Sequence, residues 1–490
     1  MRIMLKIHEK NSENINRKQA ILIISGIVLG VLMGALDNLI VSTAIPHIVN
    51  VFHQPKGIAF LISAYVISSA IGMVVFGKLS DQYSKRLILL ITITIFIIGS
   101  ILAGMSQTLS ELIIFRIIQG FGSGGFLPVG LAVIALTLPP RTRANITGAV
   151  ASFIGIAIVA GPAIGAFIVD TIGWRWVFYV NIPLGMVSFI IIAQVLETLK
   201  PKPMGKFDVL GSALLVIWVS LLLFPLVEVS DGDWSLYQPF VVAILMISLL
   251  LAVLFVYFEY RIAKEPIVPF RMFKHRNVVF STIISFFRGG IIYALSTFVA
   301  IFVTVVLVGS ANLLRDVLYF FVVPMVVGSI VGGIFLPRIS YRNICLVGMT
   351  LMALGFIPLL NISQFTPLWS FIWILPVGGF ALGLIPIGFG VGITMATTTL
   401  SAQYSVEPKD IGASSSIVQF FGSLGGGIIL SILTVVVNTT YKNHLILHNS
   451  LALSMTIGIR EAFTVLFFLS VVAIASSFFM EGELPVSSMK

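Results

Sequence analysis

Charged side chains are scarce in this sequence. Lys and Arg number 29 and Asp and Glu number 19, together 10% of the 490 residues, whereas soluble domains carry about 25%. Hydrophobic residues make up 58%, which is more than a soluble domain can bury. These proportions exclude a soluble globular enzyme and a disordered chain, and they predict a polytopic membrane protein.

Cysteine and histidine are also scarce. The single cysteine, Cys345, cannot form an intramolecular disulfide, so the fold does not depend on an oxidising compartment. No group of His, Asp and Glu residues lies at one predicted membrane level, and the sequence has no Gly-x-x-x-x-Gly-Lys-Ser/Thr loop. We therefore predict that the protein is not an enzyme or a nucleotide-driven pump, and that it has no metal site and no cofactor.

Long apolar runs, by contrast, are abundant. A membrane-crossing helix needs about 20 mostly apolar residues, and fourteen such runs lie between charged or turn-rich segments. The first run lacks a small-residue cleavage site, so we interpret it as a span and not as a signal peptide. The predicted spans are 20–46, 57–79, 87–106, 111–136, 146–169, 176–196, 208–228, 238–258, 278–307, 317–337, 343–360, 370–398, 411–436 and 461–480.

The distribution of basic residues predicts the orientation. An even number of spans places both termini on one side, and with the termini inside, 22 of the 29 Lys and Arg fall on inner segments. Five fall on outer loops, and two, Arg116 and Arg288, fall within spans. The positive-inside rule therefore predicts cytoplasmic termini. It also explains the net charge of +10 without a nucleic-acid partner.

The chain repeats itself at an offset near 260 residues. Three pairs carry the repeat, namely 125–130 with 383–388, 148–152 with 412–416, and Gly77 with Gly333. Two similar halves around a central cavity are typical of transporters, although a gene duplication without a transport role gives the same pattern. The predicted organisation is all-α, with two six-helix lobes and two extra helices between them. Its parts are a cytoplasmic segment 1–19, an N-terminal lobe 20–196, two inserted helices 197–260, a cytoplasmic connector 261–277, a C-terminal lobe 278–480 and a cytoplasmic tail 481–490.

Asp37 is the only acidic residue deep inside a predicted span. It lies nine residues before Pro46, about 13 Å below the outer end of its span, and Arg116 lies about 8 Å below the outer start of another. An apolar cavity favours the protonated carboxyl, and a nearby guanidinium favours the carboxylate. A helix movement that separates the two would change proton affinity, so we predict that Asp37 and Arg116 couple protons to transport. A static structural ion pair is the alternative.

The stretch 77–86 joins the second and third spans on the inner face. Gly77 permits close helix contact, and Asp81 can accept hydrogen bonds from basic groups or cap a helix end. Lys85 and Arg86 hold the loop at the interface. We predict a conformational latch here, and a simple topology anchor is the alternative.

The fifth span carries a cluster of glycines and a proline. Gly155, Gly161 and Gly165 let a neighbouring helix approach, and Pro162 bends the helix. This face either seals the outer part of the cavity against proton leak or is a plain kinked helix.

Arg288 lies about ten residues into the ninth predicted span, with no acidic residue nearby in sequence. Three interpretations are open. Arg288 faces the cavity and attracts an anionic or zwitterionic substrate, or it pairs with Asp37 from the other half. In the third, the span boundary is wrong and the side chain extends to water at the inner interface.

Five segments carry recognisable motifs. They are the Leu-Asp motif at 36–46, the inner-loop signature at 77–86, Arg116-Ile-Ile-Gln119-Gly120-Phe-Gly122 in the fourth span, the motif at 155–165, and the Trp-Arg-Trp segment at 174–185. The set resembles the major facilitator superfamily, in particular its fourteen-helix drug:proton antiporters. The resemblance extends over nearly the whole chain. It implies the major facilitator fold, proton coupling through Asp37 and Arg116, and efflux as the direction of transport.

We therefore predict a proton-coupled antiporter of the multidrug efflux type. It would export lipophilic or amphipathic small molecules across a prokaryotic plasma membrane by alternating access, driven by the proton gradient. The expected partners are the small-molecule substrate, protons and membrane lipids, and we expect a monomer. The alternatives are the same fold transporting one specific solute, such as a metabolite, an anion or a lipid, and a membrane enzyme or sensor.

Overall fold

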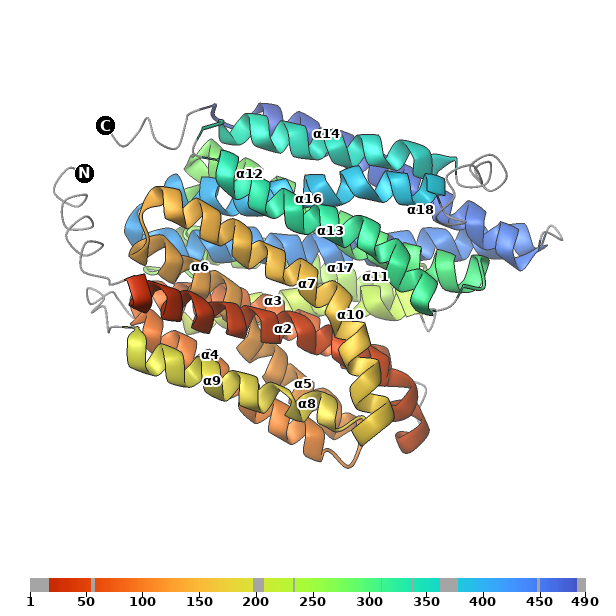
Figure 1. The fold of residues 1–490 in the computed structure, drawn as a ribbon, viewed down its shortest axis with the longest axis horizontal. Coiled ribbons are helices and arrows are strands. Elements are labelled where there is room, and N and C mark those ends of the chain that lie inside the picture. The colour runs from red at the N-terminus through yellow and green to blue at the C-terminus, as the bar shows by residue number, and fades with distance from the viewer. Residues whose placement is uncertain are drawn as a thin grey trace.

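The computed structural model describes residues 17–53, 58–196, 207–231, 234–309, 311–336, 338–361, 378–446 and 450–482. Parts of three predicted segments lie outside these residues. They are residues 1–16 of the N-terminal segment, residues 197–206 at the start of the inserted region, and the tail from residue 483. The described residues form helices and no strand. The helices run side by side as one bundle (Figure 1).

Thirteen helices of the described chain are long and apolar enough to cross a membrane, and one bent pair brings the number to fourteen. The all-helical, many-span prediction is therefore confirmed. The helices are α2 (Arg17–Phe52), α3 (Ile58–Gln82), α4 (Lys85–Met105), α5 (Leu109–Gly124), α6 (Phe126–Thr137), α7 (Pro140–Ile172), α8 (Trp176–Tyr179), α9 (Asn181–Val195), α10 (Val209–Asp231), α11 (Pro239–Arg261), η1 (Phe270–Lys274), α12 (Arg276–Ile301), η2 (Phe302–Val306), α13 (Ala311–Phe335), α14 (Tyr341–Leu360), α16 (Gly378–Tyr404), η3 (Pro408–Asp410), α17 (Ile411–Ile446) and α18 (Leu451–Phe478).

Prolines explain two interruptions inside the spans. Pro128 cannot donate to the carbonyl four residues earlier, and the predicted fourth span accordingly divides into α5 and α6 at Gly125. In α7, the segments Thr142–Ala157 and Ala160–Ile172 meet at 42°. Pro162 follows the bend by one turn, where its ring would clash with the carbonyl of residue 158. The predicted bend in the fifth span is thus present.

Three helices have bounds other than those predicted. The predicted span 370–398 corresponds to α16 (Gly378–Tyr404), which continues past the predicted end to Tyr404, while the predicted start at 370 lies outside the described residues. The predicted span 411–436 corresponds to α17, which continues to Ile446. The last helix, α18, starts at Leu451, ten residues before the predicted 461. Helices extend past the apolar run wherever polar residues continue the backbone hydrogen bonding, and hydropathy alone does not register those turns.

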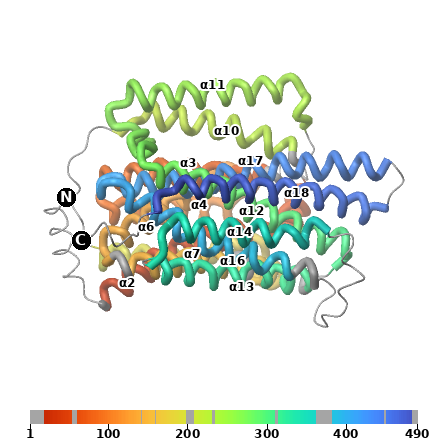
Figure 2. The backbone as a smooth tube through the Cα atoms, turned by 90° about the horizontal axis from the view of Figure 1, so that it is seen from above, coloured from red at the N-terminus to blue at the C-terminus, as the bar shows by residue number. Residues whose placement is uncertain are grey.

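The core is divided between the two halves of the chain. Two clusters of buried apolar side chains draw only on residues 23–196, and a third draws mainly on residues 284–480. A fourth cluster joins α3 and α17 to the inserted helices α10 and α11. Figure 2 shows α10 and α11 lying side by side along one flank of the bundle, next to α3 and α17.

The repeat in the sequence recurs as a repeat of contacts between the halves. A Cβ atom on Gly412 would lie 2.7 Å from the carbonyl oxygen of Gly77, so α17 and α3 touch at their backbones. A Cβ atom on Gly148 would lie 3.4 Å from the Cα atom of Gly333, so α7 and α13 touch in the same way. Each contact is the repeat equivalent of the other. This is the pattern of a self-complementary two-fold interface, here between two halves of one chain.

Candidate functional site

A buried ion pair lies inside the N-terminal half. The guanidinium of Arg116 on α5 donates to the carboxylate of Asp37 on α2, and both side chains are 0% exposed. The second oxygen of Asp37 accepts from the side-chain amides of Gln119, at 2.8 Å, and Asn181, at 2.6 Å. Arg116 also donates to Gln119, at 2.8 Å, and to Asn38, at 3.3 Å. The carboxylate thus has a charged donor and two neutral ones, as an ionised group in a dry site requires.

Other helices complete the network. Ser100 of α4 accepts from Gln119 at 2.6 Å and from Asn181 at 3.3 Å. The aromatic ring of Tyr65 on α3 lies 4.0 Å from the guanidinium carbon of Arg116, a distance at which a cation is attracted to the ring face. The hydroxyl of Tyr65 donates to the carbonyl of Gly34 on α2, at 3.0 Å. Five helices therefore converge on one charge pair.

The glycines of the fourth-span motif position Arg116. A Cβ on Gly120 would lie 2.5 Å from the carbonyl oxygen of Tyr65, and one on Gly122 would lie 2.6 Å from the backbone nitrogen of Phe96. Both distances are shorter than real Cβ contacts, so α5 can lie this close to α3 and α4 only with glycine. The two glycines therefore serve helix packing, while Gln119 of the same motif contacts the carboxylate directly.

Asp37, Arg116 and Gln119 could be predicted from the sequence, but several of their partners could not. Asn181 belongs to the Trp-Arg-Trp segment, and its place in a motif was the available signal. Asn38 likewise lies in the motif at 36–46, whereas Tyr65 and Ser100 are ordinary residues of apolar helices. Only the packing of α3 and α4 against α5 brings these last two to the charge pair.

The stretch 77–86 connects the two halves. The carboxylate of Asp81 accepts from the backbone N–H groups of Gly412, at 2.9 Å, and Ala413, at 2.7 Å, at the first turn of α17. This is helix capping by a carboxylate, with the acid and the helix in different halves. Lys85 lies 3.5 Å from Asp81, and Arg86 donates to the carbonyl of Ala193 at the end of α9.

Further cross-contacts lie at the same end of the bundle, which we call the 77–86 end. A Cβ on Gly77 would lie 2.5 Å from the Cβ of Ser416. The guanidinium of Arg143 on α7 lies 4.7 Å from the ring of Tyr404 on α16. The two halves are therefore closed against each other at this end, and Asp81 lies within the closure.

The glycines of α7 face two different partners. A Cβ on Gly155 would lie 2.7 Å from the terminal methyl of Met325 on α13, in the other half. Cβ atoms on Gly161 and Gly165 would lie 2.6 Å from the Cβ of Leu39 and 2.9 Å from the carbonyl oxygen of Ile40, both on α2. The bend near Pro162 divides these two contact regions. The motif thus packs α7 against the helix that carries Asp37.

Arg288 lies twelve residues after the start of α12 and is 3% exposed. Its guanidinium donates to the carbonyl of Thr394 at 3.0 Å and to the hydroxyls of Thr398, at 2.8 Å, and Ser285, at 3.2 Å. Of the three interpretations, the pairing with Asp37 is not present in this structure, because Asp37 binds Arg116. The side chain does not extend to water either, because it is buried and its guanidinium is bound inside the protein. Within the described residues no carboxylate pairs with this cation.

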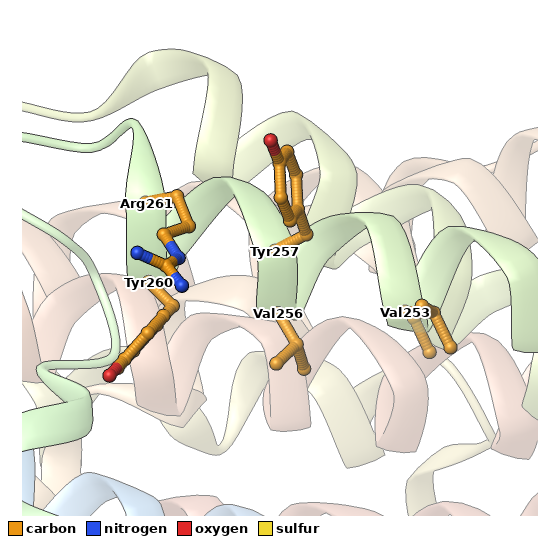
Figure 3. A pocket seen from close by; sticks show the side chains of 6 residues that line it. Val253, Val256, Tyr257, Tyr260 and Arg261 are labelled. Atoms are coloured by element: carbon orange, nitrogen blue, oxygen red, sulfur yellow. The ribbon is translucent and has the colours of Figure 1, made fainter.

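A shallow groove of about 480 Å³ lies away from this network, on the outward surface of α11. Figure 3 shows its side chains, including Val253, Val256, Tyr257, Tyr260 and Arg261. None of the predicted site residues lines it. An apolar outer face on an inserted helix is what contact with lipid requires.

Two packed, repeat-related halves of membrane-spanning helices, with a buried ion pair in one of them, define a polytopic membrane transporter. The profile of the Major Facilitator Superfamily matches residues 27–430, and the chain belongs to that family.

The chain is similar to curated transporters of that family. It is 34% identical over 427 residues to the "Multidrug resistance protein 3" of Bacillus subtilis, covering 86% of this chain and 80% of that protein. It is 32% identical over 435 residues to the "Multidrug transporter protein MdtP" of the same species, covering 89% and 78%. The predicted resemblance to multidrug efflux-type members of the superfamily is thereby confirmed.

Solved structures support the fold. The proton:xylose symporter XylE, bound to 6-bromo-6-deoxy-D-glucose, superposes with a TM-score of 0.64. The match covers 97% of this chain and 100% of that one at 15% identity. At this identity the likeness concerns the fold alone.

Proposed function

We propose that the protein is a proton-coupled efflux antiporter that exports lipophilic or amphipathic small molecules across the plasma membrane by alternating access. The observation that carries the proposal is the fully buried pair of Asp37 and Arg116. Taking a charge pair out of water is costly, and the hydrogen bonds that the carboxylate of Asp37 accepts offset part of that cost. A rearrangement that removes one partner therefore makes protonation of Asp37 favourable, and this is how helix movement becomes proton uptake or release.

The multidrug names of the similar proteins support the substrate class. "Multidrug resistance protein 3" and "Multidrug transporter protein MdtP" are 34% and 32% identical to this chain over the aligned residues. We propose that the 77–86 end faces the cytoplasm, as the distribution of basic residues predicts. Asp81 then acts as the latch that holds the cytoplasmic side closed, and the bent helix α7 transmits movement between α2 and α13.

In the proposed cycle Asp37 takes up a proton from outside and releases it inside. With the 77–86 end closed, Asp37 is ionised and paired with Arg116. Protonation neutralises the carboxyl and frees the guanidinium from its ion pair, which lets α2 and α5 move apart. Opening of the 77–86 end then breaks the Asp81 contact with α17 and lets substrate enter from the cytoplasmic side. The protein would act as a monomer driven by the proton gradient alone.

The test uses inside-out vesicles that hold a preformed pH gradient and a pH-sensitive dye. A panel of lipophilic cations and neutral drugs is added to the wild type, to Asp37→Asn and to the control Asp316→Asn. Asp316 is exposed and paired with its neighbour Arg315, so its variant should behave as the wild type. Substrates should collapse the gradient in both of these but not in Asp37→Asn. Collapse of equal size in Asp37→Asn would overturn the proposed role of Asp37.

Arg288 favours a second candidate, transport of one specific anionic solute. Its charge has no carboxylate partner in the described part of the chain, and a buried cation without a counter-ion is unfavourable. An anionic substrate group would supply that counter-ion. This second candidate is tested by adding lipophilic anions and phospholipids to the same vesicles. If the protein transports a specific anion, only anionic compounds should collapse the pH gradient.

A further inference from the structure

Two carboxyl side chains meet at the base of the inserted helices. Glu259 lies two residues before the end of α11 and is 2% exposed. Asp208 directly precedes α10. A Cβ atom on Gly211 would lie 2.1 Å from Oε1 of Glu259 and 2.6 Å from Oδ2 of Asp208, so both oxygens converge on the same glycine.

The other oxygen of each carboxyl is already bound. Oε2 of Glu259 accepts from the backbone N–H of Val268 at 3.0 Å, and Oδ1 of Asp208 accepts from the backbone N–H of Gly211 at 2.8 Å. The two facing oxygens, Oε1 and Oδ2, are both buried, and neither has a hydrogen-bond donor among the residues that the structure describes. Two acceptors that face each other without a donor are unfavourable, and two ionised carboxylates would also repel.

One proton resolves both problems. A carboxylic acid donates one hydrogen bond, so a single proton between the two oxygens satisfies both and removes the repulsion. Lys78 of α3 is a cation near enough to act on Glu259, but its ammonium lies 3.8 Å from Glu265. Lys78 therefore already has a carboxylate partner.

We propose that Glu259 and Asp208 form a second proton-binding site, separate from Asp37, which holds one shared proton and controls the connector between α11 and α12. The bond from Val268 ties Glu259 directly to this connector, residues 262–275. The proposal stands apart from the proposed function, because its test uses no substrate.

The connector links both halves at the 77–86 end. Its residues Ile267, Val268 and Met272 are buried in the cluster shared by α3 and α17. Glu265 binds Lys78 of α3, and Arg271 binds Asp410, which precedes α17, at 2.9 Å. Loss of the shared proton would leave two adjacent carboxylates beneath the connector and loosen its attachment to both halves. The inserted helices thereby make the closure at this end depend on pH.

The experiment compares the purified wild type with Glu259→Gln. The amide keeps both contacts, because its oxygen accepts from Val268 and its NH₂ group donates to Asp208, but it does not titrate. Infrared spectra are recorded from acidic to alkaline pH, and amide hydrogen exchange is measured over 262–275. Glu228→Gln is the matched control for exchange, because Glu228 is a buried glutamate on α10 near its opposite end.

The wild type should lose a protonated-carboxyl band on alkalinisation that Glu259→Gln lacks at every pH. The rate of amide hydrogen exchange over 262–275 in the wild type, divided by the rate in Glu259→Gln, should rise with pH. The rise should be at most about tenfold per pH unit, which is the limit for release of one proton. Glu228→Gln should follow the wild type in exchange. The same band in Glu259→Gln, or equal exchange in the two proteins at every pH, would overturn the proposal. If Glu259→Gln does not fold, Asp208→Asn gives the same comparison, since its amide donates to Glu259.

Discussion

The carboxylate of Asp81, at the end of α3, accepts the backbone N–H of Gly412, at the start of α17, over 2.9 Å. The two residues are 331 positions apart and belong to different halves of the transporter. A carboxylate at a helix N-terminus is favoured by both the hydrogen bonds and the helix dipole. The contact therefore stabilises the conformation that is closed at the 77–86 end.

Asp81→Asn should shift the protein towards conformations open at this end. The amide offers one acceptor atom instead of two, and its NH₂ group would oppose a backbone donor. Charge-assisted hydrogen bonds contribute about 1.5–3 kcal/mol, so the shift should be about tenfold or more. A Ser80→Cys reporter in a Cys345→Ala background, probed with a water-soluble thiol reagent, measures the opening. Asp316→Asn is the control, and unchanged labelling in Asp81→Asn would remove the latch role.

Gly77→Ala should open the same end through steric overlap. The added methyl would lie 2.5 Å from the Cβ of Ser416, whereas alanine by itself stabilises a helix by about 1 kcal/mol relative to glycine. Gly422→Ala is the matched control, since a Cβ there would meet only the carbonyl oxygen of Ser285, at 3.5 Å. The Ser80→Cys thiol should react faster in Gly77→Ala than in the wild type and should be unchanged in Gly422→Ala. Adding Ser416→Gly to Gly77→Ala should partly reverse the increase. Equal labelling in the two glycine variants contradicts this account.

Arg116→Ala should destabilise the protein more than loss of packing alone. It leaves Asp37 buried without its cation, which costs about 3–5 kcal/mol. The double variant Asp37→Asn/Arg116→Ala should be less destabilised than the sum of the two single variants, because no unpaired charge remains. Denaturant unfolding of the purified protein in detergent gives the four free energies of the cycle. Additive values would mean that the pair does not interact energetically.

Arg288→Gln should separate stability from substrate selection. Removing a buried cation that has no carboxylate partner among the described residues is expected to change the free energy of unfolding little or to raise it, while the amide can still bind Thr398 or Ser285. If Arg288 receives anionic groups, transport of lipophilic anions should fall about tenfold or more relative to that of lipophilic cations. Vesicle uptake of matched anionic and cationic dyes measures the ratio. A marked loss of stability with an unchanged ratio would assign Arg288 a structural role only.

The spans could be predicted from the sequence because apolar length is imposed by the bilayer itself. The buried acid Asp37 could be predicted for the same reason, since a charge at that depth has few explanations other than function. The motif at 174–185 contained Asn181, but only the packing of α9 shows that its amide reaches Asp37.

Contacts between distant helices could not be read from the sequence in the same way. Asp81 could be predicted to cap a helix, but not which helix, because the helix begins in the other half of the chain. The repeat is related to these contacts, because Gly77 lies against Gly412 and its repeat equivalent Gly333 lies against Gly148. Glu259 resembled an ordinary charge at a helix end, and only the fold brings it to Asp208.

The distance along the chain between Asp81 and its partner also matters during synthesis. Gly412 follows Asp81 by 331 residues, and at 5–20 residues per second the ribosome needs about 17–66 s to reach it. Throughout that interval the carboxylate lacks the helix end it will cap, while the N-terminal helices are already in the membrane. The nascent N-terminal half must therefore persist with this surface uncovered, which makes the interval a natural window for chaperone binding or for degradation of chains whose second half is defective.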